Sequence, residues 1–215
     1  MPPLVHLEQA FPKLAAAGYE QTSDQTGTPL DDGTYNCIAW AAEDTHHKFW
    51  WPDGGYWPFG VTREAEVPYF VKVFRWLGYI KCGHSRREFG FHKVAIFAIH
   101  KSRRPTPVPN KLQDFQDWTP THMARQLSDE TWTSKCGGNE DIRHFTLDAV
   151  ESYGYRPDAY GCPVLYMKRF VLISGLVHLL QFLHWKMEVA YRYRYYTEGK
   201  NRLKRLFFIF ALLPH

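Results

Sequence analysis

The 215-residue sequence contains no Cys-x-x-Cys pair, no glycine-rich phosphate loop and no uninterrupted apolar run of the roughly twenty residues that a bilayer requires. Its four cysteines are scattered, at Cys37, Cys82, Cys136 and Cys162. Zinc sites place their ligands at short, regular spacings. A site drawn from Cys82, His84, Cys136, His144 or the His46-His47 pair fits no such spacing, so the sequence predicts no metal and no cofactor.

The N-terminal residues also lack a basic segment followed by an apolar one, which argues against a signal peptide. Free thiols are then the expected state of the cysteines, and we expect an intracellular, cytoplasmic protein. The total charge of +4 is unevenly distributed. Residues 170 to 215 hold seven Lys and Arg against two Glu, a net charge of +5, which leaves −1 for residues 1 to 169. The body therefore shows no electrostatic signature of nucleic-acid binding.

This division suggests a body at 1–169 and a basic, apolar tail at 170–215 that lies outside the fold. The apolar part of the tail is interrupted by His178, Gln181 and His184 and is followed at once by Lys186. A membrane-surface helix with a basic flank is the alternative for the tail. We favour a tail that makes no membrane contact.

The most informative segment of the body is Tyr35-Asn36-Cys37-Ile38-Ala39-Trp40-Ala41-Ala42. Asn36 is a good helix N-cap, and the residues after it are apolar and compatible with a helix. Cys37 would then lie in the first turn, where free N–H groups and the helix dipole favour a thiolate. The segment predicts either a nucleophilic cysteine or a small buried side chain, the commoner role of a free cysteine.

The rest of the body predicts an α+β domain, in which helices pack on a small antiparallel sheet. Apolar residues recur at helical spacing before Gly18 and before Gly78, with Pro68 in the first turn of the second helix. Loops are expected at 19–29 and 101–120. Strands are expected at 79–82, 92–99, 122–127, 131–135 and 162–167, the second of them a buried central strand.

Residues 122–135 read as a β-hairpin that turns about Ser128-Asp129-Glu130, with His122 at its entrance. A cysteine at the start of a helix and a later histidine at the start of a strand are typical of cysteine hydrolases, in which the imidazole accepts the thiol proton. A third polar group orients the ring. The hairpin brings four candidates for that role near His122: Ser134, Lys135, Asp141 and His144. Of these, Ser134 and Asp141 have the best reach.

The stretch from His46 to Gly60 is rich in Trp, Tyr, Pro and Gly. It could form one wall of a substrate cleft, or it could cap the core, which is the more common role of an aromatic cluster. The residues that we expect around such a cleft are Asn36, Trp40, Trp50, Trp51, Tyr56, Trp57, Lys135 and His144.

The segments Tyr35–Ala42 and Thr121–Gly137, with Asp141, Ile142 and His144, resemble an uncharacterised domain-of-unknown-function family. Its motifs are Y-N-C-I-A-W-A-A and H-x-A-R-Q-L, then W-T-S-K-x-G and D-I-x-H. The resemblance covers about residues 4 to 169 and carries no established activity. More loosely, the order of elements resembles the cell-wall endopeptidase branch of the papain-like superfamily. The chain departs from that branch because Ser134 or Lys135 stands at the third position and Asn36, instead of Asp, precedes the cysteine.

Two functions remain open from the sequence. The first is a papain-like cysteine hydrolase or acyltransferase that acts on a peptide or amide bond, with Cys37, His122, Ser134 and Asp141 as catalytic residues. The second is a non-catalytic binding or interaction module with the same fold. The identity of the peptide or amide substrate does not follow from the sequence.

Overall fold

The computed structural model describes residues 4–22, 35–44, 47, 49–137, 140–156 and 158–198. Within these residues, seven antiparallel strands form one sheet in the order β1-β6-β5-β4-β3-β7-β2. The strands are β1 (Tyr19–Gln21), β2 (Ile80–Cys82), β3 (Phe91–His100), β4 (Trp118–Gln126), β5 (Trp132–Lys135), β6 (Asp141–His144) and β7 (Cys162–Phe170). The predicted α+β class with an antiparallel sheet is confirmed.

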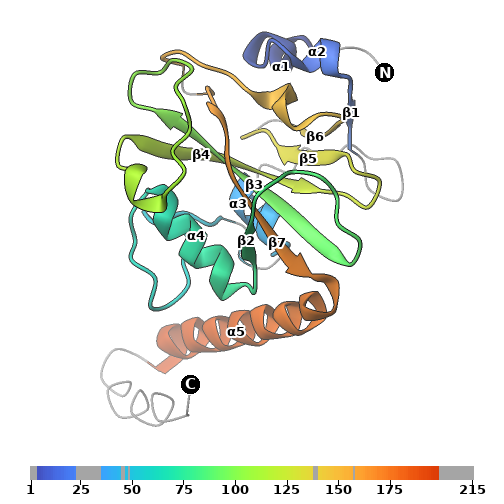
Figure 1. Ribbon diagram of the computed structural model, residues 1–215. Coiled ribbons are helices and arrows are strands. Elements are labelled where there is room, and N and C mark those ends of the chain that lie inside the picture. The colour runs from blue at the N-terminus through green and yellow to red at the C-terminus, as the bar shows by residue number, and fades with distance from the viewer. Residues whose placement is uncertain are drawn as a thin grey trace.

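Helices cover both faces of this sheet (Figure 1). They are α1 (Val5–Ala10), α2 (Leu14–Ala17), α3 (Cys37–Ala42), α4 (Val67–Trp76) and α5 (Val171–Glu198), with short 3₁₀ turns η1 (Leu112–Asp114) and η2 (Leu147–Val150). The first predicted helix is broken in two around Pro12, because proline cannot donate a backbone hydrogen bond inside a helix. Pro68 does lie in the first turn of α4, as the sequence predicts.

The central strand β3 divides the core into two layers, because successive side chains of a strand point to opposite faces. Val94 and Ile96 pack in one core with α3 and α4. Ala95 and Phe97 pack in the other core with α1, α2 and η2. Both faces of β3 are thus covered, which explains why its sequence is a continuous apolar run instead of an alternating one.

Two local details differ from the sequence-based expectations. Tyr19–Gln21 is not a loop but the edge strand β1, which pairs with β6. His122 does not open its strand but lies at the middle of β4. The polar character of residues 19–21 hid the strand, because an edge strand with half-exposed side chains needs little hydrophobicity.

The strand β4 is irregular next to His122. Phe97 of β3 pairs with His122, but the next residue, Ala98, pairs with Pro120, so Thr121 is an extra residue in a β-bulge. On its other edge, β4 pairs with β5 only from Ala124 to Gln126. The two strands therefore separate just before Ala124. The bulge at Thr121 and this separation lie on either side of His122. Such irregularities bend a strand and redirect its side chains.

The helix α5 begins directly after β7 and extends along one end of the molecule (Figure 1). Its His184 ring packs near His47 and Tyr56, with ring centroids 5.6 Å apart in both cases. Within the described residues, no helix has the length and apolar content needed to cross a membrane.

Candidate functional site

The helix α3 begins as the sequence predicts. The Asn36 side-chain oxygen accepts a hydrogen bond from the Ala39 N–H at 3.0 Å and from the Trp50 N–H at 3.2 Å. Its side-chain amide donates to the Trp50 carbonyl at 2.7 Å. Asn36 thereby caps the helix and ties the following loop to its first turn, where Cys37 lies.

The surroundings of the Cys37 thiol correct one expectation. Backbone N–H groups of Met123, Cys37 and Ile38 do favour the thiolate, but dense packing around the sulfur outweighs them and raises the pKa of Cys37 to about 11. The helix start lowers the pKa of the thiol, as expected, but the loss of hydration around the sulfur raises it by more. The thiol is therefore neutral at physiological pH, although the residue keeps partial exposure.

The contact with the Met123 N–H places the thiol against β4. Met123 is the first residue of β4, counting back from the hairpin, that has no partner on β5. Its backbone N–H faces the Cys37 sulfur where a ladder partner would otherwise lie. Cys37 thus reaches the sheet at Met123, the residue after His122, where β4 and β5 separate.

His122 itself is only 1% exposed and belongs to the face of β4 that carries Ala124 and faces Phe97. The Tyr160 ring stacks on the imidazole almost in parallel, with centroids 4.2 Å apart and an angle of 3° between the planes. Burial, with a smaller contribution from the charge of His144, lowers the pKa of His122 well below its usual value. The imidazole is therefore neutral, and one of its two nitrogens carries no proton.

A chain of buried hydrogen bonds leads away from His122. Its Nε2 lies 2.9 Å from the Ser134 hydroxyl, and that hydroxyl lies 2.9 Å from His144 Nε2. His144 Nδ1 lies 2.7 Å from the Thr146 carbonyl oxygen. Burial also lowers the pKa of His144, to about 4.

This chain can be satisfied in only one direction. The Thr146 carbonyl can only accept, so neutral His144 donates from Nδ1 and presents Nε2 as an acceptor. The Ser134 hydroxyl then donates to His144 and accepts from His122 Nε2–H. His122 Nδ1 is left as the unprotonated nitrogen, and this buried atom has no hydrogen-bond partner among the described residues. In particular, no hydrogen bond joins it to Cys37.

Lys135 and Asp141 lie on the opposite face of the sheet from Ser134, because side chains alternate along β5 and the two residues are paired. Their side chains form a fully buried ion pair at 3.3 Å. The Tyr35 hydroxyl donates to Asp141, and the Lys135 ammonium lies 5.2 Å from the Tyr35 ring centre. The structure thus brings Ser134 and His144 to His122, and uses Lys135 and Asp141 to hold the segment that leads into Cys37.

The aromatic residues predicted around a cleft separate into two groups. Trp50 is fully buried, Trp57 is 5% exposed, and both belong to the core, while Trp40 docks α3 on β5 through a hydrogen bond to Thr133 at 3.1 Å. Tyr56 and Trp57 border a separate cavity beside α5. Only Trp51 lies at the cavity next to His122. His46 lies outside the described residues.

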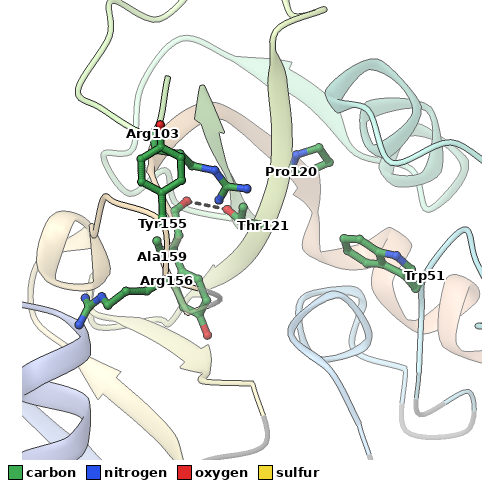
Figure 2. A pocket seen from close by; sticks show the side chains of 8 residues that line it. Trp51, Arg103, Pro120, Thr121, Tyr155, Arg156 and Ala159 are labelled. Atoms are coloured by element: carbon green, nitrogen blue, oxygen red, sulfur yellow. Dashed lines mark hydrogen bonds between the residues drawn. The ribbon is translucent and has the colours of Figure 1, made fainter. Parts of the chain in front are cut away.

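That cavity has a volume of ≈ 410 Å³ and is drawn in Figure 2. Thr121 and Pro120 of β4 form one side and Trp51 lies across from them. The remaining lining residues are Arg103 from the β3–β4 connection and Tyr155, Arg156, Ala159 and Tyr160 from the segment before β7. Neither His122 nor Cys37 lines the cavity, but Thr121 precedes His122 in β4 and the Tyr160 ring stacks on the imidazole, so the cavity lies one residue away from it.

Within the described part of the chain, no group of three or more His, Cys, Asp or Glu side chains is arranged to hold a metal ion. Three of the four imidazole nitrogens of His122 and His144 are instead hydrogen-bonded to Ser134 or Thr146. The chemistry open to the arrangement is proton transfer by the neutral imidazole of His122, while the Cys37 thiol lies at the backbone N–H of the next residue, Met123.

The sequence-based reasoning missed Tyr160 and Arg103. Tyr160 is held in place by its backbone, whose N–H donates to the Ser152 hydroxyl at 2.9 Å and whose carbonyl accepts from the Thr121 hydroxyl at 2.6 Å. Both residues lie in long connections between strands, and only the tertiary structure shows that these connections meet beside β4. Nothing in their local sequence marks them out.

Comparison with known families places the chain. Residues 26–168 match the model of a domain of unknown function, DUF7689. The chain belongs to this family. The match ends within β7, two residues before the end of the strand, and α5 lies beyond it. No curated protein and no solved structure matches the chain.

Proposed function

We propose that this DUF7689 domain is a papain-like cysteine hydrolase or acyltransferase that acts on a peptide or amide bond. The observation that carries the proposal is the hydrogen-bond chain from Thr146 through His144 and Ser134 to His122. It leaves a buried nitrogen of His122 with a free lone pair, and the Cys37 thiol contacts the backbone N–H of the next residue, Met123. A buried polar atom without a partner is costly, and such atoms mark functional sites.

In this mechanism the Cys37 sulfur attacks the substrate carbonyl carbon while its proton passes to His122 Nδ1. The backbone N–H of Cys37 is a donor for the oxygen that becomes negative. The C–N bond then breaks, and the imidazolium returns the proton to the leaving nitrogen. Water completes hydrolysis of the thioester, or an amine completes transfer, with His122 again accepting a proton.

The raised pKa of Cys37 and the lowered pKa of His122 argue for a neutral resting pair. The thiol would lose its proton during the attack instead of before it, so His122 acts as a general base and not as the partner of a standing thiolate. Ser134 would orient the imidazole, with His144 fixing the direction of the Ser134 hydroxyl. The stack with Tyr160 holds the ring plane and excludes water from one side.

A specific observation also favours the second candidate, a non-catalytic binding module. Cys37 and His122 are not hydrogen-bonded to each other, and the thiol is densely surrounded. In that case His122, Ser134 and His144 would be a buried polar network that fixes the packing of β4, β5 and β6. In either case we expect a protein of a reducing compartment such as the cytoplasm, since all four cysteines are free thiols.

Alkylation of the native protein with iodoacetamide at pH 7 tests the proposal. Cys82 is the matched control, because it is also partly exposed and also has a raised pKa, and its thiol donates to a backbone carbonyl, that of His84, at 3.6 Å. We expect Cys37 to react at least about 10²-fold faster than Cys82, the lower range of general-base assistance. Equal rates at the two cysteines would contradict the enzyme and favour the module.

A further inference from the structure

We propose that Arg103 makes the cavity beside His122 a subsite for a carboxylate, so that the substrate carries a carboxylate on the portion that occupies this cavity. The proposal rests on the proposed function only in treating the cavity as part of the substrate cleft. The carboxylate could belong to an acidic side chain or to a free peptide C-terminus.

The charges that line the cavity are all of one sign. Arg103 and Arg156 contribute two guanidinium groups, and the other lining residues are neutral: Trp51, Pro120, Thr121, Tyr155, Ala159 and Tyr160. Clefts lined by a single sign of charge concentrate ligands of the opposite sign. The body of the chain is otherwise slightly acidic, so this positive site is local and not a consequence of overall charge.

The two arginines are used differently. The Arg156 guanidinium donates to the carbonyl oxygens of Gln9 and Ala10 at 2.9 and 2.7 Å, and in Figure 2 it extends away from the cavity. The Arg103 guanidinium is directed toward Thr121, in the cavity (Figure 2). It makes no hydrogen bond or ion pair within the described residues, and this leaves its planar set of donors available to a carboxylate.

The backbone of Arg103 is fixed in an unusual conformation. Its φ angle is +57°, a left-handed value that is uncommon for a residue with a side chain. Its N–H donates to the His100 carbonyl at 2.8 Å, and its own carbonyl accepts from the Gly154 N–H at 3.0 Å. The second of these bonds ties the β3–β4 connection to the segment that carries Tyr155 and Tyr160. The guanidinium is therefore presented to the cavity by a restrained main chain.

The shape of the cavity limits what the carboxylate is attached to. Trp51, Tyr155 and Tyr160 offer aromatic surfaces, and Thr121 offers a hydroxyl that already donates to the Tyr160 carbonyl. A volume of ≈ 410 Å³ accommodates a group of the size of one or two amino-acid residues. An acyl or amide substrate with a carboxylate close to the scissile bond fits these features better than a neutral or cationic one.

The first test compares alkylation of Cys37 by iodoacetate and by neutral iodoacetamide. We expect Arg103→Gln to lower the ratio of the two rates, iodoacetate over iodoacetamide, about fivefold, which is the gain of one ionic contact in water. Arg104→Gln is the matched control, because Arg104 is an exposed neighbour that does not line the cavity. An unchanged ratio in Arg103→Gln would overturn the proposal.

The second test does not need a reactive thiol. In the Cys37→Ser variant, the NMR signals of the Arg103 Nε–H and the Thr121 amide are followed during titration with three small probes. N-acetylglycine offers a terminal carboxylate, the α-amide of N-acetylglutamate offers a side-chain carboxylate, and N-acetylglycinamide is the neutral control. We expect one or both acids to shift these signals, and Arg103→Gln to abolish the effect.

The two proposals can fail separately. Slow alkylation of Cys37 by iodoacetamide contradicts the hydrolase, while binding of the acids in an Arg103-dependent manner still supports the subsite. Fast alkylation by iodoacetamide, together with equal shifts for acids and amide, supports the hydrolase and overturns the subsite. The acid that binds more tightly identifies the source of the carboxylate.

Discussion

The proton positions around His122 are fixed by a carbonyl group, which can only accept a hydrogen bond. The Thr146 carbonyl sets the tautomer of His144, His144 sets the direction of the Ser134 hydroxyl, and the hydroxyl sets the tautomer of His122. Ser134 is small enough to sit between two imidazoles with both distances at 2.9 Å. The role of orienting group is thus divided between a serine and a second histidine behind it.

The tautomer of His122 can be measured directly. In ¹⁵N-labelled protein at pH 7 we expect Nδ1 of His122 to be unprotonated and Nε2 to carry the proton, and His144 to show the opposite tautomer. Ser134→Ala should release His122 from this state. Thr133→Val is the control, because Thr133 is the adjacent residue on β5 but faces α3 and Trp40. A protonated Nδ1 on wild-type His122 would contradict the assignment.

For individual residues, the sequence predicted which residue types form the site, but it did not predict which face of the sheet each side chain occupies. The N-cap at Asn36 and the place of Cys37 in the first turn are confirmed, because capping depends on neighbouring residues alone. Neighbouring residues alone could not show which of the four candidates for the orienting role reaches His122. A one-residue difference along β5 moves a side chain to the other face of the sheet, so Ser134 meets His122 while Lys135 and its partner Asp141 do not.

The element that positions Cys37 is α3, which is anchored at its far end by Glu43. This residue follows the helix in a left-handed conformation, with φ of 57°. Its carboxylate binds the buried Arg169 at 2.9 Å, Arg125 at 3.4 Å and His92 at 2.8 Å. Although burial opposes ionisation, these partners lower the pKa of Glu43 far below its usual value.

We expect Glu43→Gln to reduce the free energy of unfolding by about 3 kcal/mol at pH 7, because the buried Arg169 loses its countercharge. A carboxyl group with a lowered pKa stabilises the fold above its unfolded-state pKa of 4.5 and loses that effect as the pH falls. The difference between variant and wild type should therefore shrink below pH 4.5 in urea titrations.

Asp117→Asn is the matched control for this change. Asp117 forms an exposed ion pair with Lys101, whose side chains are 42% and 70% exposed, so its loss should cost less than about 1 kcal/mol. Equal costs for Glu43→Gln and Asp117→Asn would show that Glu43 does not anchor α3.

The predictability of the elements follows from their periodicity. The central strand and the hairpin are confirmed, because their apolar and alternating patterns extend over several residues. The edge strand β1 and the bulge at Thr121 were not foreseen. Both depend on pairing with distant segments, which leaves no periodic signal in three residues or in one.

The pH dependence of stability is a property of the whole molecule. In mildly acid solution we expect His122 and His144 to dominate it. Both have pKa values lowered by burial, so the unfolded chain binds protons below pH 6.5 that the folded protein does not. Each should remove about 1.4 kcal/mol of stability per pH unit as the pH falls from 6.5 to 5.

Urea titrations across this interval measure the slope, because the interval lies above the pH range in which Glu43 changes its protonation. His144→Gln should halve the slope, since only His122 then remains. A stability that does not change between pH 6.5 and 5 would contradict the assignment of two buried neutral histidines.

The boundary of the domain is a second property of the whole molecule. The family match ends at residue 168 and the sheet ends at Phe170, so we expect a chain truncated after Phe170 to remain soluble and to unfold cooperatively. The truncation removes the packing of His184 near Tyr56, and a small decrease in melting temperature is expected. Failure of the truncated chain to fold would show that α5 completes the core.

The proposed hydrolase requires His122 to serve as the base for Cys37, and the rate of Cys37 alkylation by iodoacetamide at pH 7 in wild type and His122→Gln measures this requirement. Cys82 provides the reference rate within each molecule, and the buried Cys136 reports any loss of folding. We expect His122→Gln to slow Cys37 by about 10²-fold or more, with Cys82 and Cys136 unchanged. A Cys37 rate that is the same in both proteins would contradict the role of His122 as the base for Cys37.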